Sequence, residues 1–167
     1  ASWVGPGADY WEKQFHFSDI AQARRSVMAA VRESFEETGI LLAGEDDQDV
    51  VERSSTPELM AWREAVAEQD KSFSDFLTSS GLSVRADLLR PVARWQSPDF
   101  FLKRYDIAYF TTALPVGQDP KLLLGKGVWG DWLNVRELLE AKDTSELGDR
   151  IGQPNTVGRT LDQLITP

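Results

Sequence analysis

The sequence predicts a mixed α/β protein, and three features carry that prediction. Residues 20–38 show apolar side chains at four-residue spacing, which is typical of an amphipathic helix. Residues 88–97 and 104–115 are predicted to be two strands separated by a loop, because β-branched and aromatic residues fill the second of them. A long segment with helical spacing lies between the helix and the strands. The chain has 167 residues, enough for one domain with a sizeable insertion.

Clear start and stop signals frame the first predicted helix. Ser18 or Asp19 could cap its start, and Gly39 is a natural C-terminal stop. We therefore place the helix at about residues 20–39. The apolar run "ILLA" at residues 40–43 is expected to be a short strand. The apolar stripe of the helix consists of Val27, Val31 and Phe35.

Residues 44–83 differ in character from the segments on either side. They start acidic and polar, and two amphipathic stretches at residues 57–68 and 72–81 then predict helices. We interpret the whole segment as an insertion between core elements, because strand signals resume only after it. The insertion could cover an active site, form a dimer contact or be a tolerated surface feature.

The two ends of the chain carry weaker signals. A turn is expected at Gly5-Pro6-Gly7 near the start. Residues 127–135 are predicted to form another strand, followed by a short helix at residues 135–141. A last helix is expected within residues 154–165.

Composition excludes several classes of function. Lys and Arg total 18 against 27 Asp and Glu, a formal net charge of -9, so basic patches that grip a nucleic acid polymer are not expected. If the protein handles phosphates, a divalent metal is the obvious source of positive charge. The absence of cysteine rules out disulfides, thiolate zinc sites and cysteine nucleophiles. We expect a cytoplasmic protein without a membrane segment, because no stretch approaches the ~20 apolar residues that span a bilayer.

The stretch "VRESFEETG" concentrates charge on the first predicted helix. Glu33, Glu36 and Glu37 fall on one helix face, apart from the apolar stripe, and like charges at this spacing destabilise a bare helix. A hard cation such as Mg²⁺ or Mn²⁺, which favours carboxylate oxygens, would relieve that repulsion. Arg32 could hold the Glu33 carboxylate by a charge-assisted hydrogen bond. The alternative interpretation is a solvated acidic face.

These residues carry a resemblance to a known family. "RESFEETGI" resembles the core of the box of the Nudix (MutT-like) hydrolases, which reads Arg-Glu-apolar-any-Glu-Glu-any-Gly-apolar. The chain matches it at every fixed position except Ser34, which replaces the apolar residue. The matching residues are Arg32, Glu33, Glu36, Glu37, Gly39 and Ile40.

The upstream half of the box departs from the family pattern. Arg24 and Ser18 stand where the family has a glutamate and a glycine. "VGPGAD" resembles the glycine turn of a branch with a longer spacing, which includes bacterial members and peroxisomal coenzyme A diphosphatase relatives. Only "ASWV" precedes this turn, whereas the family normally has a strand there. We therefore expect that the chain is a fragment or that N-terminal residues are missing.

The resemblance implies a fold, a chemistry and residue roles. It implies one Nudix domain over residues 1–167, an α/β/α sandwich around a mixed sheet with a helical insertion. It also implies a Mg²⁺- or Mn²⁺-dependent hydrolase that cleaves the diphosphate linkage of a nucleoside diphosphate derivative. Glu36 and Glu37 would be metal ligands, and Glu33 a ligand or the catalytic base. Arg32 would orient Glu33, and Gly7 could offer its carbonyl to the metal.

Other residues have a structural interpretation beside the functional one. Arg94 and Arg104 flank the loop "WQSPDFFLK" and could contact substrate phosphate, or they could be solvated surface residues. His16, the only histidine, is expected to be a packed or turn residue. Three tryptophans could stack a base but are more typical of a core or an interface, namely Trp95, Trp129 and Trp132.

Three hypotheses for function follow. The first is a metal-dependent hydrolase of a coenzyme A-type molecule, a nucleotide sugar or a dinucleotide, for which a homodimer is one possible state. The second is a catalytically weak Nudix domain that binds a nucleotide ligand as a regulatory module, which the irregular upstream half of the box keeps open. The third is a charged helix on a structural domain.

Overall fold

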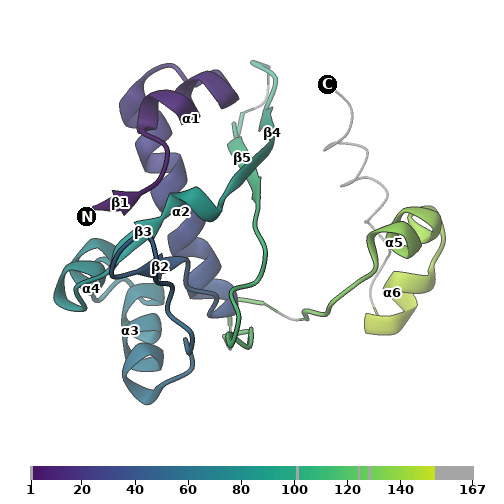
Figure 1. Cartoon of the computed structure of the whole chain (residues 1–167). Helices are drawn as coiled ribbons and strands as arrows, with labels where there is room; N and C mark the ends of the chain where they lie inside the picture. Colours follow the sequence, from purple (N-terminus) through teal and green to yellow (C-terminus); the bar gives the residue numbers. More distant parts are fainter. Residues whose placement is uncertain (1, 101, 124, 128, 153–167) are drawn as a thin grey trace. The chain divides into compact units, whose positions relative to one another are not determined.

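The computed structural model describes residues 2–100, 102–123, 125–127 and 129–152 (Figure 1). The described residues divide into two compact units. One comprises residues 2–94 and 108–127, and the other comprises residues 95–107 and 129–152. The expected single domain over residues 1–167 stays a prediction.

The long helix α2 spans Ile20–Thr38, as predicted. It begins where Asp19 accepts a hydrogen bond from the Gln22 backbone N–H at 2.6 Å, which satisfies one of the free donors of the first turn. It ends at Gly39, whose left-handed φ of 77° lets its N–H donate to the Phe35 carbonyl at 3.0 Å. The buried residues of its inner face include the predicted Val27, Val31 and Phe35.

A shorter helix that the sequence analysis missed, α1 (Ala8–Phe15), precedes α2 and packs against it (Figure 1). It follows the expected turn at Gly5-Pro6-Gly7 and buries Trp11 and Phe15, which are one helical turn apart. Two buried apolar residues are too few to reveal a helical period in the sequence of this segment. His16 ends α1 in the left-handed conformation, as expected of a turn residue.

A mixed sheet of short strands lies in the first unit. Within the described residues it has the order β1 (Trp3–Val4), β3 (Ser83–Arg85), β2 (Ala43–Gly44). β1 runs parallel to β3 and β2 runs antiparallel to it, with Val84 opposite both Trp3 and Ala43. A 3-10 turn at Ala86–Leu88 follows β3.

The strand expected at residues 40–43 is wrong for all but its last residue. The buried side-chain amide of Gln118 explains the difference, because it takes both backbone groups of Leu41. Its Oε1 accepts from the Leu41 N–H at 2.8 Å, and its Nε2 donates to the Leu41 carbonyl at 2.8 Å. A side chain thus occupies the positions that a neighbouring strand would fill.

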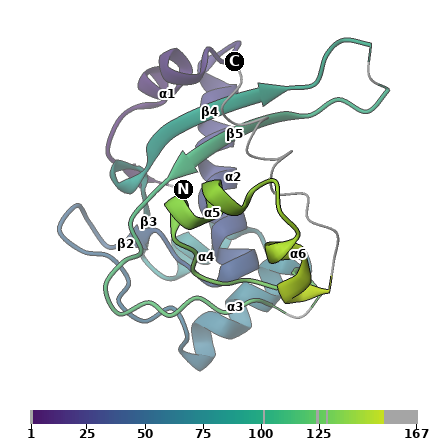
Figure 2. The ribbon, with the colours of Figure 1, turned by 90° about the vertical axis from the view of Figure 1, so that its right-hand side faces the viewer.

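The two predicted strands are confirmed as β4 (Arg90–Gln96) and β5 (Asp106–Thr111). They pair with each other and run side by side as a hairpin (Figure 2). Aromatic residues of α1 pack on the first-unit part of β5. The rings of Trp11 and Phe15 lie 5.5 and 4.8 Å from that of Phe110, both in edge-on arrangements.

The insertion forms two helices, α3 (Pro57–Ala67) and α4 (Phe73–Ser79), close to their predicted positions. Thr56 and Ser72 cap them through their hydroxyl groups. Both helices contribute to the hydrophobic core, because Val66, Phe73, Phe76 and Leu77 are buried in it. The insertion is therefore an integral part of the core.

The second unit carries α5 (Val135–Ala141), as predicted, and α6 (Glu146–Ile151). The strand expected at residues 127–135 is wrong for its described residues, which join no strand. The Asp131 carboxylate accepts from the Trp132 N–H at 2.8 Å, and Asn134 caps α5. Such local side-chain bonds compete with strand pairing. The last helix expected at residues 154–165 lies outside the described residues.

No helix in the described part of the chain is both long and apolar enough to cross a membrane.

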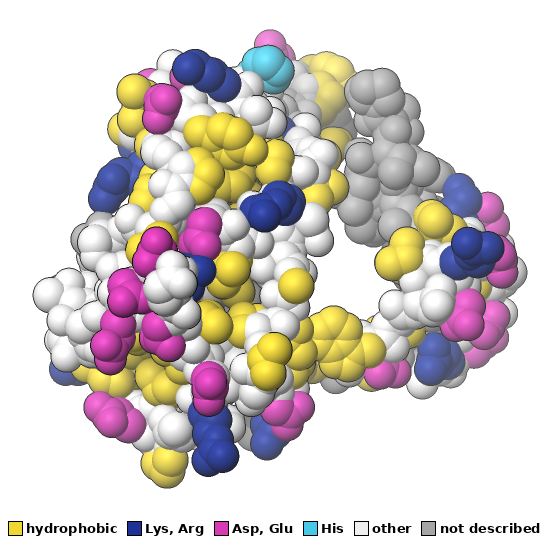
Figure 3. Space-filling model, in the orientation of Figure 1, with side chains coloured by type: hydrophobic (Ala, Val, Ile, Leu, Met, Phe, Trp, Pro, Cys, Tyr) yellow, Lys and Arg dark blue, Asp and Glu magenta, His cyan; other side chains and the backbone are white. Residues whose placement is uncertain are grey.

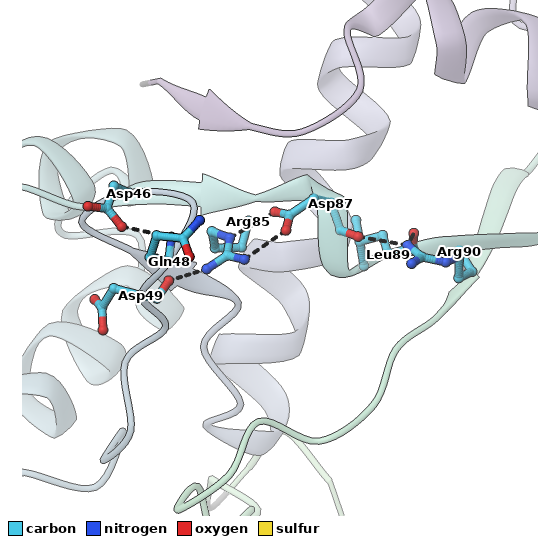
Figure 4. Close-up of polar contacts among 7 residues, drawn as sticks. All are labelled: Asp46, Gln48, Asp49, Arg85, Asp87, Leu89 and Arg90. Carbon is cyan, nitrogen blue, oxygen red and sulfur yellow. Dashed lines mark hydrogen bonds and ion pairs between the residues drawn. The ribbon is translucent and has the colours of Figure 1, made fainter.

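Arg85 ties β3 to the loop after β2 (Figure 4). Its buried guanidinium donates to both carboxylate oxygens of Asp87, at 2.8 and 2.7 Å, and to the Asp49 carbonyl. Acidic side chains gather on the face over β2 and β3 (Figure 3). The hydrogen bonds from Arg85 lower the pKa of the Asp87 carboxyl, and those to Asp87 raise the pKa of Arg85.

A matched pair of leucine substitutions tests whether the insertion belongs to the core. Leu77 in α4 is fully buried, whereas Leu102 is fully exposed. Leu77→Ala should lower the free energy of unfolding by about 2–5 kcal/mol, because it removes packed methyl groups and leaves a cavity. Leu102→Ala should change it by less than about 0.5 kcal/mol. Urea unfolding measures both values, and equal effects would contradict this account of the core.

Asp87→Asn should destabilise the protein by about 2 kcal/mol at neutral pH, because the buried Arg85 loses a charged partner. The folded-state pKa of Asp87 lies below its unfolded value, so its stabilisation is present above the unfolded pKa. That stabilisation is lost as the pH falls through the folded pKa. The difference between wild type and variant should therefore shrink below about pH 4. Unfolding curves at several pH values measure it, and a difference that grows in acid would disprove the pairing.

Candidate metal and hydrolase site

Three charged side chains on α2 form a connected group. The Arg32 guanidinium donates to Glu33 Oε1 at 2.9 Å and to Glu36 Oε1 at 2.7 Å. The second contact joins residues one helical turn apart, which is a favourable spacing for an ion pair on a helix. Arg32 therefore offsets part of the repulsion between Glu33 and Glu36.

The three glutamates differ in burial. Glu33 and Glu37 are exposed, but Glu36 is only 8% exposed. The expectation that all three lie away from the packed face is wrong for Glu36. The reason is that α3 and α4 pack beside this end of α2. Arg32 supplies the charged partner that a buried carboxylate needs.

An open pocket of about 350 Å³ adjoins the Arg32–Glu36 pair. One wall comes from α2 and the other from the insertion, at the end of α3 and in its connection to α4. The insertion thus borders the candidate site. The lining residues are Arg32, Glu36, Val66, Gln69, Asp70, Lys71, Ser72 and Phe73.

The C-terminal end of α2 is held by Arg63 of α3, which is 1% exposed. Arg63 Nε donates to the Glu36 carbonyl at 3.0 Å, and Nη2 donates to the Lys121 carbonyl at 2.7 Å. Its guanidinium lies against Gly39, where an added Cβ would come within 3.1 Å of Nη1. Burial lowers the pKa of Arg63, and the neighbouring Glu64 carboxylate partly opposes that effect.

The segment at residues 118–121 is fastened to the same end of α2. The Lys121 N–H donates to the Thr38 carbonyl at 2.8 Å. The Gln118 amide that holds Leu41 also donates to the Val51 carbonyl at 2.6 Å. Residues 118–121 therefore hold both the last turn of α2 and the polypeptide that follows it.

The donor chemistry of α2 suits a hard divalent cation, since Mg²⁺ prefers carboxylate oxygens. Glu37 has no hydrogen-bond or ion-pair partner among the described residues, so its carboxylate is available. The described residues contain no group of three or more acidic or histidine side chains placed to hold a metal. Glu33 and Glu36 are instead directed to Arg32. The residues fit a metal by type, with Arg32 competing for two of the three carboxylates.

The remaining predicted site residues have contacts of other kinds. The Gly7 carbonyl accepts from the Tyr10 N–H at 3.0 Å in the first turn of α1. Arg94 donates to the Phe15 carbonyl at 3.1 Å and lies over the Phe17 ring, so it supports the end of α1. Arg104 belongs to the second unit and pairs with Asp99. Metal binding by Gly7 and substrate binding by Arg94 and Arg104 stay predictions.

Two residues that support the site were missed by the sequence analysis. A signal for Arg63 existed, because it stands four residues after Leu59 and three before Val66, on the apolar side of α3. An arginine on that side is a candidate for a buried hydrogen-bonding role. Gln118 lies in an irregular loop, where periodicity gives no information about burial.

The crystal structure of a NUDIX hydrolase from Alicyclobacillus acidocaldarius is similar to this chain, with a TM-score of 0.62 and 21% sequence identity. The similarity covers 98% of this chain and 79% of that one. No family model matches the chain, and no curated protein matches it. The chain shares the fold of that solved structure, which confirms the predicted α/β class.

Gly39→Ala tests the fit between the end of α2 and Arg63. Gly81, with a φ of 66° and no neighbour within 4 Å of an added Cβ, is the matched control. Both substitutions place a side chain in the left-handed region, which costs about 1–2 kcal/mol. Gly39→Ala should cost about 1 kcal/mol more, because it also crowds the Arg63 guanidinium. Equal losses in the free energy of unfolding would show that Arg63 is not tightly packed there.

Proposed function

We propose that the protein is a metal-dependent hydrolase that cleaves the diphosphate linkage of a nucleoside diphosphate derivative. One observation carries the proposal: in a Nudix fold, the helix that bears Glu33, Glu36 and Glu37 ends at Gly39 as the family motif requires. The acidic charge of the chain agrees with it, since bound metal would let an acidic surface accept an anionic substrate.

Each residue of the group has a role in this proposal. Glu36 and Glu37 would hold Mg²⁺ or Mn²⁺, and Glu33 is a further ligand or the base that accepts a proton from the attacking water. Arg32 orients Glu33, a role supported by their 2.9 Å contact. When bound, the metal would stabilise the negative charge that develops on the diphosphate oxygens.

The substrate class follows from the resemblance and the pocket. Coenzyme A-type molecules, nucleotide sugars and dinucleotides all contain a diphosphate between a nucleoside and a second group. The lining of the pocket beside Glu36 combines charges of both signs, from Arg32, Lys71, Glu36 and Asp70, with the apolar residues Val66 and Phe73. A pocket of about 350 Å³ suits a small molecule better than a nucleic acid polymer.

A second candidate, a Nudix domain that binds a nucleotide without turnover, is favoured by one observation. Arg32 holds both Glu33 and Glu36, and the described residues contain no group of three acidic side chains placed around a metal. A ligand could bind such a site without metal-assisted hydrolysis.

Glu37→Gln should reduce diphosphatase activity by more than about a hundredfold, because even outer residues of a metal site are worth about 10–100-fold. Glu37 is exposed, so circular dichroism should show an intact fold. Glu140→Gln, an exposed glutamate of α5, is the control and should retain full activity. An unchanged rate for Glu37→Gln would overturn the assignment of the metal site.

A panel of substrates separates the two candidate functions. Coenzyme A, ADP-ribose, nucleotide sugars and dinucleotides should each be incubated with Mg²⁺ or Mn²⁺, and the released products measured. Metal-dependent cleavage of at least one of them supports the hydrolase. Binding by calorimetry without cleavage of any would support the regulatory module instead.

A further inference from the structure

We infer that Arg63 is a positioning residue for the metal ligands of α2, supplied by the insertion and joining the end of α2 to the segment at residues 118–121. This inference rests on the proposed function. It is carried by two hydrogen bonds from one buried guanidinium, to the Glu36 carbonyl at 3.0 Å and to the Lys121 carbonyl at 2.7 Å.

The Glu36 carbonyl needs a donor from outside α2. The last four carbonyls of an α-helix lack regular intrahelical partners. The residue that would continue the pattern, Ile40, instead donates its N–H to Thr38 Oγ1 at 3.2 Å. Arg63 therefore satisfies a terminal carbonyl of the residue whose side chain is a candidate metal ligand. Movement of Arg63 would be transmitted directly to the Glu36 backbone.

The positive charge of Arg63 lies at the C-terminal end of α2. Arg63 is 1% exposed, and its described hydrogen-bond partners are the two carbonyls rather than a carboxylate. Carbonyls at a helix C-terminus carry partial negative charge and attract a cation. Gly39 leaves the space that the guanidinium occupies. The glycine of the motif thus serves both the helix stop and the approach of Arg63.

The second hydrogen bond of Arg63 holds the segment at residues 118–121. The Lys121 carbonyl accepts from Arg63, and the Lys121 N–H donates to the Thr38 carbonyl at 2.8 Å. Lys121 is therefore fixed to both α3 and α2. A cation bound by Glu36 and Glu37 should consequently stiffen residues 118–121 as well as the end of α2.

Substitutions at two buried arginines distinguish positioning from general stabilisation. Arg63→Lys and Arg63→Met are compared with Arg85→Lys and Arg85→Met, since Arg85 is 7% exposed and its side-chain hydrogen bonds go to Asp87 and Asp49, not to α2 or residues 118–121. Lysine keeps the charge but cannot donate to two carbonyls with the planar fork of arginine. Variants that remain folded by circular dichroism are titrated with Mn²⁺ by calorimetry and assayed for kcat and KM.

The expected result is specific to Arg63. Its variants should bind Mn²⁺ about 10–100-fold more weakly, as for other residues that orient metal ligands, with lysine less affected than methionine. Their kcat should fall more than KM rises. The Arg85 variants should lose stability but keep the Mn²⁺ affinity of wild type. Equal Mn²⁺ affinity in wild type and folded Arg63 variants would overturn the inference while leaving the proposed function intact.

Hydrogen exchange on the wild-type protein tests the inference without any variant. Addition of Mg²⁺ should slow amide exchange at residues 36–41 and also at residues 118–121. Protection of residues 36–41 alone would contradict the coupling through Arg63. If wild-type protein bound neither Mg²⁺ nor Mn²⁺, the proposed function would fail and the inference with it, which is a different outcome from a failure at Arg63 alone.

Discussion

Phe35 and Phe76 stack with ring centroids 5.2 Å apart and an angle of 6° between their planes, which ties α2 to the insertion. Both rings are fully buried, and Phe73 packs against both. Phe35 directly precedes Glu36, so this contact fixes the helical turn from which the candidate ligands project. Because α3 and α4 are held here, Arg63 can reach the end of α2. A segment that interrupts the core elements in sequence thereby supports the helix that carries the candidate ligands.

Electrostatics at the candidate site depend on how Arg32 is shared. The helix carries three carboxylates in five residues, within a chain of formal net charge -9. Arg32 contacts Glu33 and Glu36, while Glu37 stays exposed and available. Under the proposed function, a divalent cation would compete with Arg32 for the carboxylates of Glu33 and Glu36.

Much of this fold could be predicted from the sequence where periodicity and caps agree. The limits of α2 follow from its caps, Asp19 and Gly39. The two insertion helices and the β4–β5 pair follow from the spacing of their apolar residues. The candidate ligands were recognisable because their spacing on a helix is fixed. The absence of a strand at Leu41 could not be predicted, because the side chain of Gln118, which is distant in sequence, takes the place of a strand partner there. The burial of Glu36 and the reach of Arg63 also depend on packing between segments far apart in sequence, which local patterns do not record.

A crystal structure of the protein soaked with Mn²⁺, with anomalous diffraction collected at the manganese edge, would show whether Glu36 and Glu37 bind a divalent cation at the end of α2, as proposed. We expect an anomalous peak in contact with the carboxylates of Glu36 and Glu37, with Arg63 still bonded to the Glu36 carbonyl. A peak bound only by other acidic residues, such as those of the loop after β2, would contradict it.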